Sequence, residues 1–555
     1  MYVRYGVDGA SIFCKYWHTV EAKSEEEGFQ GLLVFHSHLT FCVYLTTSHS
    51  TYETDEENDE ETAYSDRLTE KYGHVIEKYG HVIEKYGHVI DQYDHVIEKY
   101  DHVIEKYGHV IEKYGHMIEK YGHVIEQYGH VIEKYGHVIE CLPDEKFMPP
   151  IGNGHIATNV LSDTIYMNGF YNGYREDSHR ARLQATSAVD VQFNDDRESR
   201  YYALDMFNGI FYQKIYHPTQ NTSITIMYFA HRKYDTLLVT HVSVQQILPS
   251  NISFICSKGG LSQDIGNSSE VKVDNSTTYW SGENKRPETD DLEPMRFHHV
   301  WTKKVNVSED YINDTYRSNW ISITSIGTDK EEVFSLYRKA LEMTHDNLVN
   351  QHKQEWNRIW KKGHIEIHGD DKELQRNIHA AFYNILSSLP QKQNVHNPFI
   401  GLSPGGLSRG GKINPNKTGG PSNNYAGHVF WDMDTWIMPP IMMFHPNLAR
   451  LMINSRIRVL DTAKKNAKGT GYLGARFPWE QAVTGIDTCP WDLASKYQVH
   501  VTADVSYALR QYLYVSSKDA AIEMLTNGGS SLALEIAKFW ESRVNKTDDR
   551  NDILG

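Results

Sequence analysis

At 555 residues, the chain is long enough for several domains of ordinary size, each with a buried core. Its net charge of −16, from 72 acidic and 56 basic residues, disfavours nucleic acid and anionic membranes as partners, because both attract clustered positive charge. No apolar run reaches the roughly 18 residues that a membrane span requires. Its 5 cysteines form neither a zinc pattern nor a disulfide framework. We therefore expect no metal, no cofactor and no obligatory disulfide.

The cellular compartment stays open. Residues 1–30 lack the basic region, apolar block and cleavage site of a signal peptide. The chain carries about twice as many Asn-X-Ser/Thr sequons as chance predicts, which favours a secretory or lysosomal lumen, while a cytoplasmic protein stays compatible with the sequence. The sequons begin at Asn221, Asn251, Asn267, Asn275, Asn306, Asn313, Asn416 and Asn545.

The chain begins with two segments for which no folded core is predicted. Residues 1–69 show no sustained period and contain an acidic run at 53–61, so we expect an irregular, disordered segment. Residues 70–140 are dominated by tandem copies of Glu-Lys-Tyr-Gly-His-Val-Ile. The seven-residue period places Tyr, Val and Ile on one stripe of a helix, which would allow self-association through a coiled coil.

Two features of this heptad repeat oppose a stable helix. Most copies contain a glycine, which costs about 1 kcal/mol relative to alanine. A bulky Tyr occupies the seam, where Leu or Ile is usual. A helix or coiled coil and a disordered tract are therefore equally open for 70–140. On a helix, successive histidines of the repeat would lie about 10 Å apart, which is too far for two of them to share a metal ion.

A domain rich in short strands is predicted over 141–330. Apolar runs alternate there with turn residues, as at 164–169, 223–229 and 235–244. Many short strands at this spacing are typical of an antiparallel β-sandwich.

Helices are predicted for most of the remaining chain. Apolar residues at three- and four-residue spacings predict one amphipathic helix over 331–360, within a helical linker at 331–370. A short strand at 365–369 is expected to close against the sandwich. In the last domain, 371–555, the patterns predict helices at 371–389, 446–468, 502–514 and 530–543, with Gly469 ending the second.

The stretch 428–436, His-Val-Phe-Trp-Asp-Met-Asp-Thr-Trp, concentrates aromatic and acidic residues between two of these helices. Aromatic faces cover the apolar C–H side of a pyranose, while carboxylates accept hydrogen bonds from its hydroxyls. The stretch is therefore a candidate sugar site. The alternative is a packed Trp pair at the start of a helix, with Asp432 or Asp434 as its cap.

The order of the motifs resembles glycoside hydrolase family 65. The resemblance spans about 142–544, does not extend to 1–140, and is carried by segments at 166–173, 401–408, 428–436, 444–446, 456–461, 477–480 and 500–504. That family contains trehalases, disaccharide phosphorylases and glucosidases. The resemblance is strongest to the branch that acts on glucosyl-galactosyl-hydroxylysine of collagen.

The resemblance implies an antiparallel β super-sandwich, a helical linker and an (α/α)6 barrel whose loops hold one terminal glucosyl unit. Trp431 and Asp432 would bind the glucosyl hydroxyls, Trp479 and Glu480 would form a second wall, and His500 would add a polar contact near the scissile bond. The implied reaction is inverting release of α-linked glucose. One carboxylic acid protonates the leaving oxygen, and a second carboxylate about 6.5–9.5 Å away activates water.

The general acid of the family is a Glu shortly after a Phe-Trp-X-Ser-Arg motif, matched here at 539–543. On that pattern the acid lies beyond Gly555, so we expect 371–555 to form an incomplete barrel without a catalytic residue. Loss of a general acid typically removes a factor of about 10² to 10⁴ in rate. We therefore expect no hydrolysis by this chain alone.

Three functions remain open from the sequence. The first is an exo-acting α-glucosidase, of which this chain supplies the sugar-binding part. The second is a disaccharide phosphorylase or trehalase of the same family. The third is a non-enzymatic protein, either a carbohydrate-binding pseudoenzyme or an interaction protein organised by the heptad repeat. Glucose released from the collagen disaccharide would separate the first from the third, whereas phosphate-dependent formation of glucose 1-phosphate would indicate a phosphorylase.

Overall fold

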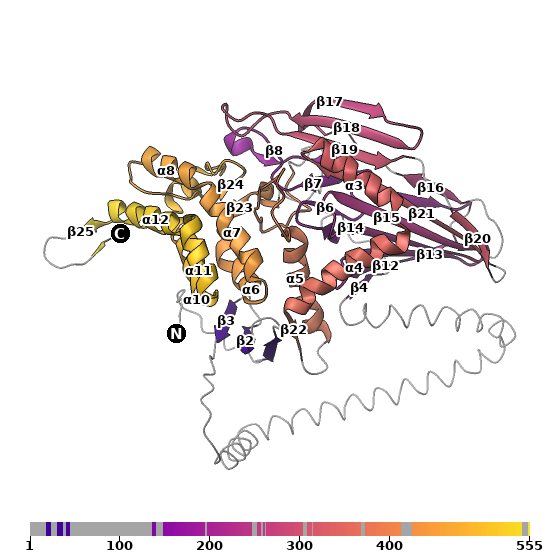
Figure 1. The fold of residues 1–555 in the computed structure, drawn as a ribbon, viewed down its shortest axis with the longest axis horizontal. Helices are drawn as coiled ribbons and strands as arrows, with labels where there is room; N and C mark the ends of the chain where they lie inside the picture. Colours follow the sequence, from indigo (N-terminus) through magenta and orange to yellow (C-terminus); the bar gives the residue numbers. More distant parts are fainter. Residues whose placement is uncertain are drawn as a thin grey trace, which may run out of the picture. The chain divides into compact units, whose positions relative to one another are not determined.

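The structure is a computed structural model in which the described residues form a large antiparallel β-sheet region followed by a helical region (Figure 1). The acidic run at 53–61 and the heptad repeat at 70–135 lie outside the described residues. The described residues are 18–23, 30–36, 40–44, 136–139, 148–194, 197–246, 252–256, 259–260, 262–303, 308–312, 315–367, 372–411, 424–546 and 553–554.

The segment expected to be irregular contains three strands. They form an antiparallel sheet in the order β22-β1-β2-β3. Val34 and Phe35 in β2 favour this extended backbone, because β-branched and aromatic residues are enriched in strands. The strand predicted at 365–369 therefore closes against the N-terminal segment and not against the main sheet. The strands are β1 (His18–Lys23), β2 (Gln30–His36), β3 (Thr40–Tyr44) and β22 (His364–Glu366).

Ten strands form the main antiparallel sheet of the described residues, in the order β17-β18-β19-β21-β15-β14-β13-β12-β4, with β20 paired to β21. Side chains of β14 alternate between buried and half-buried from Thr222 to Tyr228, as expected when one face covers a core. The strands are β4 (Gly136–Ile139), β12 (Ser199–Asp205), β13 (Ile210–His217), β14 (Thr222–Ala230), β15 (Leu237–Gln246), β17 (Ile265–Lys272), β18 (Thr277–Asn284), β19 (Arg296–Thr302), β20 (Ser308–Ile312) and β21 (Thr315–Gly327).

The last copy of the heptad repeat forms a strand and not the helix that was one of its two predicted states. Its Gly-His-Val-Ile forms β4, which pairs with β12 at the edge of the main sheet. Glycine and β-branched residues are poor helix formers, and the strand ladder satisfies their backbone groups instead.

Smaller antiparallel sheets complete the strand inventory of the described residues. One has the order β10-β7-β6-β5, and the others are the pairs β8-β9, β11-β16, β23-β24 and β25-β26. Their bounds are β5 (Pro150–Gly152), β6 (Ile156–Asn159), β7 (Thr164–Met167), β8 (Tyr171–Asn172), β9 (His179–Arg180), β10 (Leu183–Gln184), β11 (Val189–Gln192), β16 (Ser253–Cys256), β23 (Val429–Phe430), β24 (Glu480–Gln481), β25 (Asn545–Lys546) and β26 (Ile553–Leu554).

Two helices follow the sheet where one was predicted over 331–360. They are α3 (Lys330–Glu342), which packs on β19 and β21, and α4 (His345–Lys362). The break lies at Met343, whose backbone is extended. The Thr344 hydroxyl then caps α4 by accepting a hydrogen bond from the Asn347 amide at 3.3 Å.

The helical region matches the predicted helices at 371–389, 502–514 and 530–543 with small changes at their ends. The helix predicted over 446–468 is divided at Val459, whose amide donates to the Arg456 carbonyl three residues earlier. The helices are α5 (Lys372–Ser388), α6 (Met438–Phe444), α7 (Pro446–Arg458), α8 (Leu460–Gly469), α9 (Asp492–Tyr497), α10 (His500–Val515), α11 (Lys518–Met524) and α12 (Ser530–Arg543). Short turns of 3-10 or π geometry lie at Arg175–Asp177, Asn424–Gly427, Met433–Ile437 and Leu525–Gly529.

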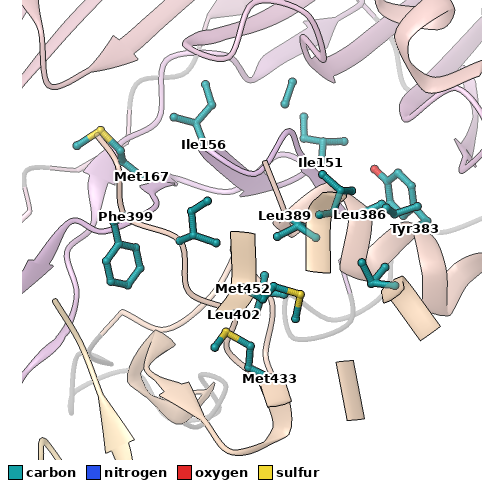
Figure 2. Close-up of a cluster of buried hydrophobic side chains, with 14 of the residues drawn as sticks. Ile151, Ile156, Met167, Tyr383, Leu386, Leu389, Phe399, Leu402, Met433 and Met452 are labelled. Carbon is teal, nitrogen blue, oxygen red and sulfur yellow. The ribbon is translucent and has the colours of Figure 1, made fainter. Parts of the chain in front are cut away.

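A continuous apolar core joins the two regions. Figure 2 shows Ile151 and Ile156 from the sheet region near Leu386 and Leu389 at the end of α5, with Met452 of α7 below them. All five side chains are buried. The sheet region and the helical region are therefore packed against each other, which fixes the loops between them. In the part of the chain that the structure describes, no helix is both long and apolar enough to cross a membrane.

Candidate active site

The short β23-β24 ladder brings together two Trp–acid pairs that lie far apart in the sequence. Phe430 pairs with Glu480, and Val429 pairs with Gln481. Trp431 and Asp432, called the first wall below, directly follow β23. In the second wall, Trp479 directly precedes β24 and Glu480 is its first residue. Because the two strands are antiparallel, the end of one meets the start of the other.

The two wall tryptophans form an aromatic cluster with His500. The ring centroids of Trp431 and Trp479 are 6.3 Å apart, and the His500 ring lies 5.1 Å from Trp431 and 5.7 Å from Trp479. All three side chains are half-buried, so part of each ring surface stays accessible. Three of the five residues proposed from the sequence therefore lie close together, with their rings in mutual contact. A partly exposed aromatic surface of this kind fits the apolar face of a sugar.

The two aspartates of 428–436 lie in different environments. Asp432 is half-buried, precedes the π-helical turn Met433–Ile437 and does not cap it with its side chain. Partial burial raises the pKa of Asp432, and the neighbouring charge of Asp434 raises it further. Asp434 is buried and forms an ion pair with Arg456. Asp432 is therefore the carboxylate of the pair that is left for a ligand, whereas Asp434 is a structural group.

The carboxylate of the second wall, Glu480, is held by a hydrogen bond to a buried histidine. Glu480 is 6% exposed, and its Oε2 accepts a hydrogen bond from Nδ1 of the fully buried His428 at 2.8 Å. Thr488 Oγ1 lies 3.2 Å from the same nitrogen and donates to the Glu480 carbonyl at 3.3 Å. These contacts fix the rotamer of Glu480 and occupy one of its two carboxylate oxygens.

His500 is held by an aspartate one helical turn later. His500 begins α10, and its Nδ1 lies 2.6 Å from Asp504 Oδ2. Burial raises the pKa of Asp504, and the hydrogen bond from His500 opposes this shift. Because Nδ1 faces Asp504, Nε2 is the ring nitrogen left for a ligand.

A buried arginine connects both walls. Arg456 of α7 donates from Nε to Asp434 Oδ1 at 3.2 Å and from Nη2 to the Phe430 carbonyl at 3.1 Å. Its Nη1 donates to Gln481 Oε1 at 3.1 Å. One guanidinium thus bonds a residue of β23 and a residue of β24, so the spacing of the walls depends on it.

A second buried arginine fixes the turn that leads into the first wall. Arg180 of β9 donates from Nη2 to the Gly427 carbonyl at 2.9 Å, and from Nη1 to the Gly406 carbonyl at 2.8 Å. Tyr425 and Ala426 adopt left-handed φ angles of 60° and 51°, which are unfavourable for residues with a Cβ atom. Contacts from the sheet region therefore stabilise a strained approach to the site.

The described residues of the site favour binding by stacking and hydrogen bonds. No group of three or more His, Cys, Asp or Glu within them is placed to hold a metal ion. Cys489 is buried beside this site, and burial raises the pKa of its thiol to about 12, so it stays protonated at neutral pH.

The site contains residues that the sequence analysis did not identify. Asp504 could have been found, because it lies four residues after His500 on a predicted helix, where side chains meet. His428 lies within the stretch 428–436, but nothing in its spacing indicated that its side chain would form a hydrogen bond with Glu480. Arg456 belongs to a helix whose pattern gives no indication that its charge is buried under two loops.

Comparison with known proteins supports a carbohydrate-active enzyme family. Residues 416–555 match the glycosyl hydrolase family 65 central catalytic domain. A protein-glucosylgalactosylhydroxylysine glucosidase of Mus musculus is 30% identical over 419 residues, covering 73% of this chain and 57% of that protein. A kojibiose hydrolase of Flavobacterium johnsoniae is 36% identical over 243 residues, covering 44% of this chain and 30% of that protein.

The fold has a solved counterpart. A structure from the human microbiome, named as a kojibiose phosphorylase, superimposes with a TM-score of 0.59 at 16% sequence identity, over 76% of this chain and 61% of that one. The present chain spans 57% of the length of the mouse glucosidase that it matches. The family match, the sequence similarity and the shared arrangement of a sheet region before a helical region agree. Residues 416–555 therefore carry the central catalytic domain of glycosyl hydrolase family 65.

Proposed function

We propose that this chain provides the glucose-binding part of an inverting α-glucosidase that releases terminal glucose from a unit such as glucosyl-galactosyl-hydroxylysine. The observation that carries the proposal is the half-buried cluster of Trp431, Trp479 and His500, in which each tryptophan is directly followed by an acid, Asp432 or Glu480. The exposed faces of these rings would hold the sugar ring, while the carboxylates accept hydrogen bonds from its hydroxyls. The name of the mouse relative supports this substrate class.

The finer architecture belongs to the same proposal. We infer that the sheet region is a β super-sandwich and that the helices from α5 onwards are part of an (α/α)6 barrel. The proton donor is proposed to be a glutamate C-terminal to the Phe-Trp-X-Ser-Arg motif at 539–543. The described residues would then bind and orient the glucosyl unit, and Asp432 and Glu480 would not transfer the proton.

Glucose binding by this chain tests the proposal directly. Titration calorimetry should detect glucose binding, and Trp431→Ala should weaken it by about tenfold or more, since loss of one aromatic platform costs roughly 1–3 kcal/mol where nucleobases stack on it. Trp491→Ala is the matched control, because that indole is 71% exposed and lies outside the aromatic cluster. Unchanged affinity in Trp431→Ala would remove the first wall from the sugar site.

The reaction class needs a separate measurement. Glucose release from glucosyl-galactosyl-hydroxylysine, measured with a version of this chain extended C-terminally to supply the proposed proton donor, should proceed without phosphate. If turnover required inorganic phosphate and produced glucose 1-phosphate, the protein would be a phosphorylase. Kojibiose should be included as a substrate, because two of the related proteins carry its name.

A further inference from the structure

Glu288 links the sheet region to the second wall. It lies in the connection between β18 and β19, and its side chain is 3% exposed. Its Oε2 accepts hydrogen bonds from the amides of Val483 at 2.8 Å and Thr484 at 3.1 Å. Its Oε1 accepts a third bond from Thr484 Oγ1 at 2.7 Å. One buried carboxylate thus binds two consecutive residues of a loop in the helical region.

The position of these two residues makes the contact relevant to the site. Val483 and Thr484 come shortly after β24, which consists of Glu480 and Gln481 alone. A two-residue ladder provides few bonds to hold a loop in place. The three bonds to Glu288 anchor the chain immediately beyond β24, so the direction of the second wall depends on them.

Glu288 is itself held rigidly on the sheet side. The neighbouring Arg286 amide donates to Asn172 Oδ1 at 2.8 Å, and the Arg286 carbonyl accepts from the Gly173 amide at 2.8 Å. The Glu288 carbonyl accepts a bond from the Arg175 amide at 3.1 Å. The carboxylate is therefore presented by a segment whose backbone is tied to β8 and to the turn after it.

Burial of this carboxylate has a cost that the loop contacts offset. Burial raises the pKa of Glu288, while the bonds from Thr484 and Val483 and the nearby His428 favour its charged form. His428 also contacts Glu480, so the same ring lies close to both buried acids. A buried carboxyl group at this place indicates a specific role in shaping the loop, because an apolar side chain could not accept hydrogen bonds from two amides.

We propose that Glu288 is a positioning residue for the sugar site, which holds the second wall in place from the sheet region. Through Val483 and Thr484 it fixes β24, so that Trp479 and Glu480 face the terminal glucosyl unit. The sheet region then contributes to binding and is more than a support for the helices. This inference rests on the proposed function, because it assigns the second wall to a sugar.

Three variants test this role. Glu288→Ala removes all three bonds, so amide hydrogen exchange at 483–484 should become about tenfold faster, and the dissociation constant for glucose should rise about tenfold. Glu288→Gln keeps an oxygen for the two amides and can donate to Thr484 Oγ1, so both quantities should stay within about threefold of the wild type. Glu293→Ala is the control, since Glu293 is exposed in the same connection and carries the same charge.

The outcomes separate the two proposals. Unchanged exchange at 483–484 in Glu288→Ala would overturn the positioning role, whatever the glucose result. Faster exchange with unchanged glucose affinity would also overturn it, because the loop would then move without consequence for binding. If the wild type bound no glucose, the proposed function would fail, while the exchange data would still decide whether Glu288 holds this loop. Should Glu288→Ala not fold, Glu288→Asp, shorter by one methylene, replaces it with the same expectations.

Discussion

The two walls of the site share one sequence signature, a tryptophan followed by an acid, but their carboxylates are held differently. Asp432 in the first wall is half-buried and does not cap the turn that follows it. Glu480 in the second wall is buried and hydrogen-bonded to His428. The same pair of residue types therefore produces one adaptable carboxylate and one fixed carboxylate.

This difference follows from what lies behind each wall. The second wall is bonded to His428 and Thr488 at Glu480, and to Glu288 just beyond β24. The first wall leads into a π-helical turn, and the arginine behind it pairs with Asp434. A side chain fixed before binding loses less conformational entropy when a ligand arrives. We expect Glu480 to select the orientation of the sugar, and Asp432 to adjust to it.

The largest effect is expected from Arg456, because it joins the two walls. Arg456→Leu would leave the carboxylate of Asp434 buried without a cation and would remove the bonds to Phe430 and Gln481. Breaking a buried ion pair on one side typically costs about 3–5 kcal/mol. Urea unfolding should show a loss of this size, together with loss of glucose binding.

Arg450 provides the control for this experiment. Its ion pair with Glu523 is partly exposed, so Arg450→Ala should cost no more than about 1 kcal/mol. If Arg456→Leu destabilised the protein no more than Arg450→Ala does, Arg456 would not be the group that joins the walls.

His428 should affect the second wall alone. His428→Leu removes the donor to Glu480 Oε2, and a lost hydrogen bond to a charged group costs roughly 1.5–3 kcal/mol. Glucose affinity should fall by about tenfold, whereas His428→Asn, whose amide nitrogen can replace Nδ1, should recover most of it. Titration calorimetry with glucose measures the affinity of both variants. Equal affinities for the two variants would show that the donor to Glu480 does not matter.

Sequence reasoning succeeded where a local pattern determines the outcome. The strands of the sheet region and the helix at 530–543 follow from the spacing of apolar residues. The assignment of both walls to one sugar site, implied by the resemblance to the family, stays a prediction. Sequence reasoning failed at breaks, because Met343 and Val459 interrupt helices whose apolar period continues through them. It also failed for Glu288, because no local pattern shows which distant loop a buried charge will bind.

The smallest effect is expected at Asp432, and its sign distinguishes the walls. Because its pKa is raised in the folded protein, the folded state binds a proton more tightly than the unfolded chain does. The charged form therefore reduces stability at neutral pH, and this penalty disappears as the pH falls below the unfolded pKa of about 3.9. Asp432→Asn should raise stability at pH 7, by less than about 1 kcal/mol since the group is half-exposed, while weakening glucose binding.

Glu480→Gln should instead lower stability, since it weakens the hydrogen bond from His428. Urea unfolding at pH 7 and near pH 4 measures both signs, and a loss of stability in Asp432→Asn at pH 7 would show that the two carboxylates are held alike.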